Sequence, residues 1–386
     1  MLPLTHATPG VYWEQSVSSP APEFLTGVPV LIGFATKGDV ARPQLLTLWT
    51  QFVEIFGIAG TSDLPDAVQG FFGNGGRACY VVRLRDFISI EAALAEALEA
   101  IAVLDGVDLV CAPDLATSSQ DTAQLLPMQE ALLDYCQEMG DRFAILDTHR
   151  NATIDDVVEQ QQQLSSHPGS HNSALYFPWI QVQHLNTSLP KLIPPCGHIA
   201  GIYAQSDLDV GVHKAPANFV INGAVDLSLL LSDAERQKLN LNNQDNQVGK
   251  INCLRILPGR GIRVWGARTL SQDAAWRYVN VRRLFLMVGR WIDRNLTNFT
   301  FEPNDIMLWI RIERELTAYL ETLLAQGALQ GNSPQEAFYI KCDAETNPPE
   351  VRDRGMVITE IGLAPTVPSE FIVVRLIQGE TGVTLV

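Results

Sequence analysis

The sequence has few charged side chains and no long apolar run. Charged residues make up 18% of the 386-residue chain, below the roughly 25% of typical soluble domains. Hydrophobic residues reach 46%, yet no run of about 18 apolar residues is available to span a bilayer. The opening MLPLTHATPG also lacks the basic and apolar segments of a secretory signal peptide. These absences argue against a membrane span and favour a chain that keeps part of its surface against partner chains.

Cysteine pairs and metal-ligand clusters are missing as well. The six cysteines stand singly at positions 79, 111, 136, 196, 253 and 342. None forms a CxxC pair, and none lies at zinc-ligand spacing from a histidine. We therefore expect buried thiols, no metal site, and assembly of the protein in a reducing cytoplasm.

The usual catalytic motifs are absent. The glycines of GFFGNGGRACYVV follow a predicted helix and precede a strand, the reverse of a dinucleotide-binding loop. No Walker or GxSxG motif is present, so we expect no cofactor. Asp114 and Asp147 end two predicted strands, with His149 nearby, and α/β enzymes place catalytic groups at such ends. An enzyme using these three residues is the alternative hypothesis, although turn and cap roles are more common.

What the chain does contain, between residues 23 and 249, is an alternation of short apolar strands with longer helices. After VPVLIGFATKG, strands are predicted in RACYVVRL, VDLVCAP, RFAILD and ALYFPWIQV, and helices over 46–56, 64–72, 91–104, 122–139 and 154–165. The alternation is typical of a mainly parallel sheet with helices on both faces. We interpret 23–249 as an α/β domain, preceded by an extended arm of residues 1–22.

The pattern changes at residue 250. Two strands (INCLRIL and GIRVWGA), two long helices (273–295 and 304–326) and three more strands (AFYIKCD, GMVITEIGL and EFIVVRLIQ) follow in order. This order predicts an α+β domain over 250–386, with a strand arm at its C-terminal end.

Charge is distributed unevenly along the chain. The formal net charge is −16 and the pI about 4.8, which argues against nucleic acid or an anionic membrane as a direct partner. Residues 250–298 nevertheless carry ten basic and two acidic side chains, a local net of +8. Such asymmetry commonly marks where a partner lies.

Arginines account for much of this local charge. At about 100° per residue, the helix over 273–295 has an apolar face, and three arginines cluster on the opposite side: Arg283, Arg290 and Arg294. Leu286 and Met287 share that side. A partly apolar, partly cationic surface is typical of an interface that holds and then releases its partner.

Several segments, taken in order, resemble a known family. They are FFGNGGRACYVVRL, ALYFPWIQV, PPCGHIAGIYAQSD, VHKAPAN, GIRVWGARTL, WRYVNVRRLF, FEPND and LWIRIERELTAYLETLLAQGAL. Together they resemble the sheath protein of contractile phage tails and related injection systems, from about residue 9 to residue 376. The family includes phage tails, bacteriocin-like particles and cellular injection systems alike.

The resemblance implies a function and a set of partners. Sheath subunits form a helical homopolymer around an inner tube and contract, without nucleotide, to drive the tube through a target envelope. The implied partners are other copies of the subunit, the tube protein, and baseplate and terminator or cap proteins, with no direct nucleic-acid or membrane contact. The C-terminal domain is expected to lie nearest the tube.

The resemblance also implies strand exchange by the two arms. Residues expected to pair with neighbouring subunits are Val11, Tyr12, Trp13, Phe371, Ile372, Val373 and Val374. The alternative is pairing of the terminal strands within one subunit. For Arg283, Arg290 and Arg294 we hypothesise contact with acidic groups of the inner tube. Here the alternative is pairing with acidic residues of the same or a neighbouring subunit. A third function class, nucleic-acid binding through these arginines, would require steep salt dependence, and the acidic remainder of the chain disfavours it.

Overall fold

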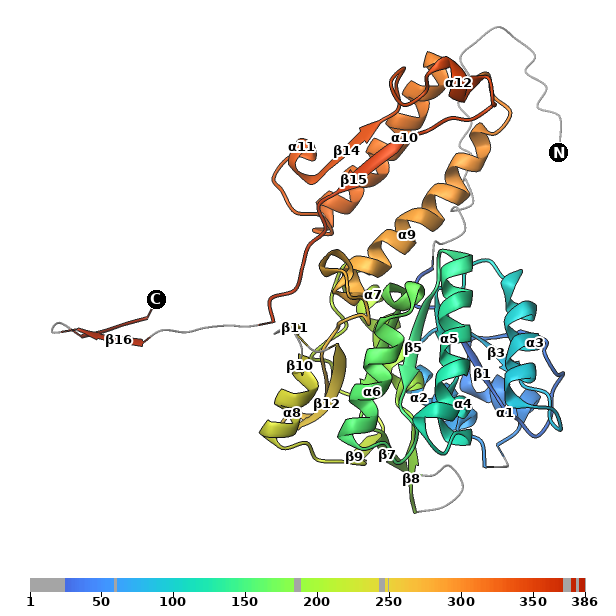
Figure 1. Cartoon of the computed structure of the whole chain (residues 1–386), viewed down its shortest axis with the longest axis vertical. Helices are drawn as coiled ribbons and strands as arrows, with labels where there is room; N and C mark the ends of the chain where they lie inside the picture. Colours follow the sequence, from blue (N-terminus) through green and yellow to red (C-terminus); the bar gives the residue numbers. More distant parts are fainter. Residues whose placement is uncertain are drawn as a thin grey trace, which may run out of the picture.

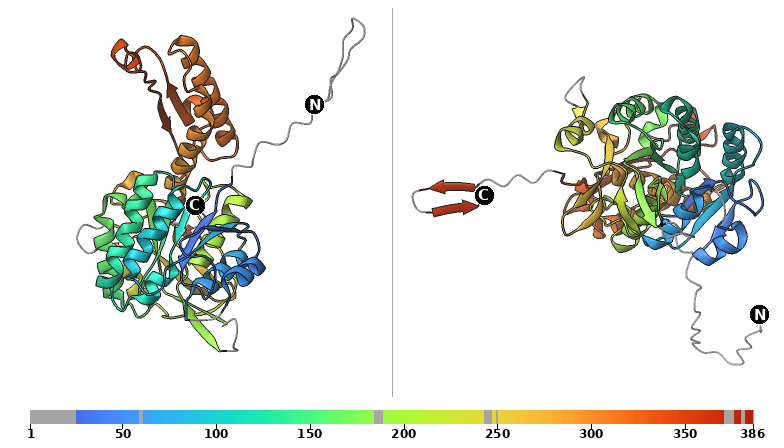
Figure 2. Two further views of the ribbon diagram at one scale, coloured as in Figure 1. Left: turned by 90° about the vertical axis from the view of Figure 1, so that its right-hand side faces the viewer. Right: turned by 90° about the horizontal axis from the view of Figure 1, so that it is seen from below.

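The computed structural model describes residues 25–58, 61–183, 189–242, 247–248 and 250–370, and the strands at 376–379 and 382–385. Figure 1 shows two units. A wide body is formed by the chain up to residue 278, and a narrower lobe, residues 279–363, projects from one end of it. The left view in Figure 2 shows the lobe standing clear of the body from a second direction.

An eight-stranded sheet forms the centre of the body, in the order β13-β12-β6-β5-β4-β1-β3-β2. Its strands are β1 (Pro29–Gly33), β2 (Gln44–Leu46), β3 (Cys79–Arg83), β4 (Leu109–Cys111), β5 (Phe143–Asp147), β6 (Ser173–Phe177), β12 (Ile251–Leu257) and β13 (Gly261–Trp265). Neighbours from β12 to β3 pair in parallel, and the two edge strands pair antiparallel. β1, β5 and β6 are buried along their whole length, as expected of parallel strands covered on both faces. The predicted mainly parallel sheet is confirmed.

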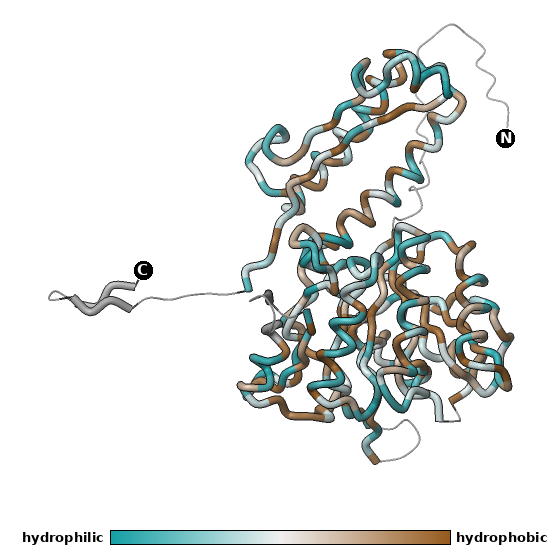
Figure 3. The backbone as a smooth tube through the Cα atoms, in the orientation of Figure 1, coloured by the Kyte–Doolittle hydropathy of each residue, from teal (hydrophilic) through white to brown (hydrophobic). Residues whose placement is uncertain are grey.

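Helices cover both faces of this sheet. One face carries α1 (Trp49–Phe56), α2 (Leu64–Gly73) and α7 (Cys196–Asp209), and the other carries α3 (Ile90–Ala102), α5 (Thr122–Met139) and α6 (Ile154–Ser165). Side chains of Ser89, Asp121 and Thr153 accept backbone N–H bonds at the starts of α3, α5 and α6, which satisfies donors that a helix start leaves free. Figure 3 shows the apolar colouring concentrated in the central strands and alternating along the helices.

Shorter elements complete the body. They are α4 (Pro113–Ser118), α8 (Asp233–Asn240), a small sheet of β7 (Ile180–Gln183), β8 (Pro190–Ile193) and β9 (Ala224–Leu227), the pair β10 (Leu241–Asn242) and β11 (Gln247–Val248), and the 3-10 turns η1 (Pro168–Asn172) and η2 (Ala274–Trp276).

Helix α7 packs unusually close to α2, and glycine permits this contact. A Cβ atom on Gly197 would lie 2.4 Å from the carbonyl oxygen of Ala67, far inside van der Waals contact. The two backbones therefore touch without an intervening side chain. This packing fixes α7 against the body, and α7 carries two residues of the site described below.

The boundary between the two units lies later in the chain than the predicted residue 250, because the next two strands join the sheet of the body. β12 pairs in parallel with β6, and β13 pairs antiparallel with β12. Both strands therefore belong to the body rather than to the second unit. The unit that stands apart begins only with α9 (Val279–Leu296), because apolar side chains of the two strands pack into the body's clusters.

The lobe is a two-helix layer on a two-stranded sheet. It contains α9, η3 (Thr297–Phe299), α10 (Ile306–Ala325), α11 (Pro334–Ala337), β14 (Phe338–Lys341), α12 (Pro349–Arg352) and β15 (Glu360–Leu363). β14 and β15 pair antiparallel. Trp291 of α9 stacks on Tyr319 of α10, with ring centroids 3.9 Å apart and planes 2° apart. The α+β architecture predicted for this region is confirmed.

Helix α9 contributes to the cores of both units. Val279 and Leu286 pack into the body, whereas Leu284 and Val288 pack into the lobe. The helix therefore runs through the junction as one continuous element.

The two predicted arms lie mostly outside the described residues. Residues 1–24 and 371–375 are not described, and they include every residue expected to exchange between subunits. Beyond them, β16 (Leu376–Gly379) and β17 (Gly382–Leu385) form an antiparallel hairpin. Leu376 and Ile377 therefore have partners within this chain, which the sequence pattern does not predict.

Candidate interface at the junction of body and lobe

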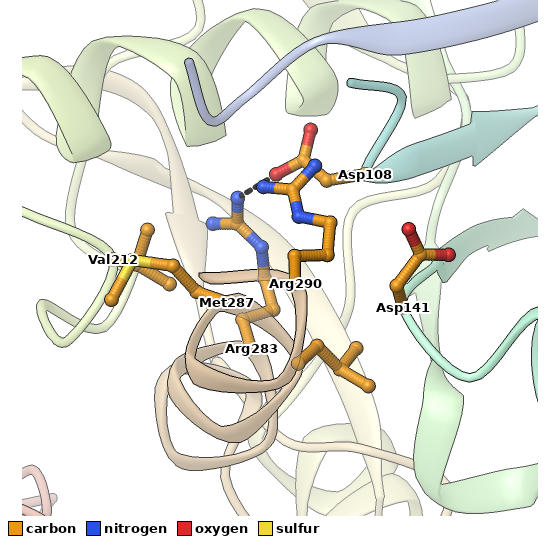
Figure 4. A pocket seen from close by; sticks show the side chains of 7 residues that line it. Asp108, Asp141, Val212, Arg283, Met287 and Arg290 are labelled. Atoms are coloured by element: carbon orange, nitrogen blue, oxygen red, sulfur yellow. Dashed lines mark hydrogen bonds and ion pairs between the residues drawn. The ribbon is translucent and has the colours of Figure 1, made fainter. Parts of the chain in front are cut away.

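A buried arginine joins the lobe to the body. Arg283 of α9 is 3% exposed. Its Nη1 and Nη2 donate to the carboxylate of Asp207 at 2.8 and 2.6 Å, and Nη2 also donates to Asp108 at 2.9 Å. Figure 4 shows Arg283 and Arg290 beside Asp108 in a small pocket. Burial alone would lower the pKa of Arg283, but the two carboxylates raise it, so the guanidinium stays charged.

Aromatic side chains complete the surroundings of Arg283. Its guanidinium carbon lies 5.0 Å from the ring centroid of Tyr203, within the range of a cation–π contact. The Tyr203 hydroxyl lies 2.7 Å from that of Tyr176 on β6. Tyr203 and Asp207 are one helical turn apart on α7, so the same face of that helix presents both to the arginine.

The same cluster holds the segment that leads out of the N-terminal arm, residues 25–28, which we call the N-terminal root. Backbone N–H groups of Gly27 and Val28 donate to Asp108 at 2.9 and 2.7 Å. Arg290 donates to the carbonyl of Leu25 at 3.4 Å. Asp108 therefore binds the arm root and the lobe helix at once.

Gly27 is required for this arrangement. Its φ is +69°, and an added Cβ would lie 2.5 Å from the Cα of Ala204 on α7. The left-handed backbone conformation and the close approach each make any other residue at this position costly. The N-terminal root is thus fixed in direction where it meets the body.

Asp141, in the loop before β5, lines the same pocket as Arg290 (Figure 4). Burial raises the pKa of Asp141 to about 6, against the opposing effect of Arg290. Arg290 itself is 8% exposed. Two arginines (Arg283 and Arg290) and three aspartates (Asp108, Asp141 and Asp207) therefore meet where the N-terminal root, the body and α9 converge.

The segment that leads into the C-terminal arm is also fixed. We call residues 364–370 the strap. At its lobe end, the backbone N–H groups of Ala364 and Thr366 donate to the carbonyls of Ala337 and Ala328 at 2.8 and 3.1 Å. At its body end, Arg268 donates to Glu370 through Nε at 2.8 Å and through Nη2 at 2.5 Å. The strap therefore crosses from lobe to body beside the start of α9.

The predicted exposed face of three arginines does not form. Arg283 and Arg290 are buried, and only Arg294 is exposed. The reason is that the first half of α9 lies against the body, so its cationic side is covered as well as its apolar side. Arg283 pairs with acidic residues of its own chain, as the alternative hypothesis anticipates.

The strand-end carboxylates serve structural roles. Asp114 accepts the N–H groups of Phe34 and Asp63 at 2.6 and 2.7 Å and the Ser62 hydroxyl at 2.7 Å. Asp147 accepts the N–H of Cys196 at 3.1 Å. Burial raises the pKa of Asp114 to about 6 and that of Asp147 to about 7. Each carboxyl group thus joins neighbouring loops to its strand. This is the turn and cap role, which the sequence predicts as the more common one for such residues.

His149 does not complete a catalytic pair with them. Its Nε2 lies 3.8 Å from the carboxylate of Asp156, on the first turn of α6. All six cysteines are free and buried, as predicted. Across the described part of the chain, no cluster of three or more candidate ligands could hold a metal ion. Among the helices in those same ranges, none is long and apolar enough to cross a membrane.

Comparison with solved structures defines the class of protein. A chain in the cryo-EM structure of the anti-feeding prophage baseplate matches with a TM-score of 0.78 and 28% identity, covering 97% of this chain and 100% of that one. A chain in the contracted sheath complex of an extracellular contractile injection system, PVC, matches with a TM-score of 0.76 and 28% identity, covering 98% and 99%. The body and lobe together are therefore the fold of a contractile-sheath subunit.

Family models identify the family itself. The phage tail sheath protein central domain matches residues 91–270, and the phage tail sheath C-terminal domain matches residues 271–378. The chain belongs to the phage tail sheath family, a family of structural proteins. The tail sheath protein of Salmonella phage ViI is 26% identical over 251 residues, which is 61% of this chain and 37% of that protein. The match thus spans little more than a third of that relative's length.

Sequence reasoning missed most of the junction residues. Asp108 and Asp207 are part of no motif. A search for acidic residues at the carboxyl ends of strands does not find Asp108, because this residue precedes β4. The isolated surplus of arginines near residue 280 was the one available signal, because a buried arginine requires buried acids elsewhere. Pairing it with Asp108 and Asp207 requires the fold.

Proposed function

We propose that this protein is the subunit of a contractile sheath, which polymerises helically around an inner tube and contracts to drive that tube through a target envelope. The full-length likeness to a chain of a contracted sheath complex carries this proposal, since it covers 98% of this chain and 99% of the other. Contraction would require no nucleotide, because an extended lattice assembled in a metastable state releases free energy as subunits rotate and bury new surface.

The partners in this proposal are other copies of the chain, an inner tube protein, a baseplate, and a terminator or cap. The likeness to a chain of a baseplate structure supports the baseplate as one of them. Assembly in the cytoplasm of the producing cell remains part of the proposal.

The sheet of the lobe supports the proposal that subunits exchange strands. β14 and β15 form a sheet of two strands within the described residues, so each strand has an edge on which an arriving strand could pair. The donors would be the segments around Tyr12 and Val373. Deletion of residues 1–20 is expected to abolish the polymer and leave a folded monomer. Normal polymers from the deleted chain would remove strand exchange by the N-terminal arm.

Contact with the inner tube is proposed for the tip of the lobe. Of the three arginines, Arg294 alone is exposed, and it lies near the turn between α9 and α10. The same tip exposes Phe301, Ile306 and Met307, whose side chains are 102%, 63% and 63% exposed. Phe301 also has a φ of +70°, a backbone conformation that is costly for a non-glycine residue. Such a surface fits a partner that covers it in the assembly.

The tube contact can be tested apart from folding. Arg294→Glu is expected to leave the subunit folded and to weaken co-assembly with the tube protein, more strongly at low salt, since one exposed charge contact contributes about 0–1 kcal/mol. Arg260→Glu, at an exposed arginine of the body, is the matched control. Equal co-assembly of both variants with the tube would contradict the role of Arg294.

The experiment that tests the proposed function is negative-stain electron microscopy of the protein expressed alone and with its candidate tube protein. Hollow, striated cylinders are the expected result. Monodisperse monomers in both samples would overturn the sheath proposal.

A further inference from the structure

The last residue of the strap, Glu370, forms an ion pair with Arg268, and we call this pair the clamp. Glu370 is the residue before the undescribed segment 371–375, and Arg268 binds its carboxylate with two parallel N–H···O bonds. This bidentate geometry fixes the plane of the carboxylate as well as its distance. The side chain of Arg268 is 9% exposed and that of Glu370 is 22% exposed. The pair is therefore more shielded from water and salt than a surface ion pair.

Arg268 is itself held in place by the body. Asn252 of β12 is fully buried, and its side chain bonds both the backbone N–H and the carbonyl of Arg268, each at 2.8 Å. Asn252 lies on β12, so the clamp is fixed to the eight-stranded sheet of the body.

The start of α9 supports the clamp from the other side. Arg268 forms a backbone bridge with Tyr278, whose hydroxyl donates to Glu370 at 3.4 Å. Asn280, in the first turn of α9, donates to the carbonyl of Thr366 at 3.1 Å. The strap is therefore held at Thr366 and again at Glu370. These two attachments restrict the movement of the residues between them.

We propose that Arg268 and Glu370 are positioning residues for strand donation: they fix the direction in which the C-terminal arm leaves the subunit and so select the neighbour and register that receive it. This inference rests on the proposed strand exchange. Its physical basis is preorganisation, because a root fixed before assembly has less conformational freedom to lose when the arm pairs. Without the clamp, the arm would pivot from Thr366, and its donating strand would sample a larger volume.

The clamp can be opened with little change in shape by Glu370→Gln. Glu345→Gln is the matched control, because Glu345 pairs with Lys341 on the exposed surface of the lobe. A spin label on Val367→Cys, a strap residue that is 54% exposed, reports the mobility of the strap. The six native cysteines are buried and free, so the label is directed to the introduced thiol.

We expect Glu370→Gln to raise the mobility of the label in the isolated subunit and to raise the protein concentration needed for assembly by about tenfold, in line with the loss of one charge-assisted pair. Glu345→Gln should change neither. The charge-swapped pair Arg268→Glu with Glu370→Arg should recover part of the assembly, which a merely destabilised subunit would not do.

Two results would overturn the inference. The first is an unchanged label mobility in Glu370→Gln, which would show that the pair does not hold the strap. The second is a mobile strap with normal assembly, which would show that root direction does not matter for donation. Failure of the wild-type chain to assemble would refute the proposed function and the donation role together, and the label would then report the clamp alone.

Discussion

The body and the lobe differ in how far their polar groups and apolar side chains find partners within the chain. In the body, the sheet is covered on both faces, and the buried carboxyl groups of Asp114 and Asp147 both have internal partners. In the lobe, a two-stranded sheet covers two helices, and Phe301 is fully exposed at the tip. Each unit has a fully exposed phenylalanine, Phe87 in the body and Phe301 in the lobe, so the difference lies in the sheets. The sheet of the body is covered on both faces, whereas the sheet of the lobe leaves Tyr339 exposed. The predictions below test this difference, from the largest expected effect to the smallest.

The largest effect is expected from Arg283→Met. The substitution leaves the buried Asp207 and Asp108 without their cation, and breaking a buried ion pair on one side costs about 3–5 kcal/mol. The free energy of unfolding, measured by urea denaturation, should fall by that amount. Arg294→Met on the same helix should change it by less than about 0.5 kcal/mol, as is usual for surface sites. Equal effects of the two substitutions would show that the junction does not depend on Arg283.

A smaller and local effect is expected from Trp291→Ala. This half-buried side chain stacks on Tyr319 and packs within the lobe, and its removal should cost about 2–3 kcal/mol. Because the body has its own core, amide hydrogen exchange should accelerate in α10 and β14 and remain slow in β1 and β5. Acceleration throughout the chain would mean that body and lobe unfold as one unit.

The pH dependence of stability should reveal the buried carboxylates of the body. Burial raises the pKa of Asp147 to about 7 from an ordinary value of 3.8. The folded state therefore keeps a proton that the unfolded chain releases, so this group's stabilisation is complete below about pH 4 and is lost as the pH rises through 7. Across that window its contribution to the unfolding free energy falls by about 1.4 kcal/mol per pH unit.

Asp147→Asn tests this assignment. Asparagine keeps an oxygen for the Cys196 N–H and cannot ionise, so the variant should lose that part of the slope between pH 4 and pH 7. Asp155→Asn, at an exposed position on α6, should keep the wild-type slope. A variant Asp147→Asn with an unaltered profile would locate the responsible groups elsewhere, with Asp114 the first to examine.

The smallest effect is expected from Gly289→Ala. Gly289 lies in the interior of α9, is exposed, and has no heavy atom within 4 Å of an added Cβ. Alanine should stabilise the isolated subunit by about 0.5–1 kcal/mol, the usual difference inside a helix. Thermal unfolding would measure the gain. A loss of stability would indicate that α9 needs a bend at this position.

Much of the fold follows from the order of apolar segments. The strands around Val30, Val110 and Ile145 are short and apolar, and helices long enough to connect parallel strands separate them. This order favours a parallel sheet. β12 and β13 show the limit of this reasoning. Their hairpin pattern is the same whichever sheet they join, and the pairing of β12 with β6 in the folded chain places them in the body.

The site was less predictable, for a physical reason. The periodicity of α9 reports which side chains share a side, and it does not report how many neighbours surround the helix. Arg283 and Arg290 lie on the side opposite the apolar stripe, as predicted, yet the body covers them. The strap was equally unpredictable, since Arg268 and Glu370 lie 102 positions apart in the sequence and no local pattern pairs them.

Helix α9 and the strap have a joint mechanical consequence. A lobe carried on a single connection could twist about it, but two connections, α9 and the strap, each bonded to both the body and the lobe, resist torsion. At about 1.5 Å per residue, α9 is a stiff rod, and Arg268 with Glu370 fixes the strap to the body. Bending within the subunit is therefore expensive. If the subunit serves in a contracting lattice, the compliance must reside in the joints between copies, and each copy turns as a solid piece.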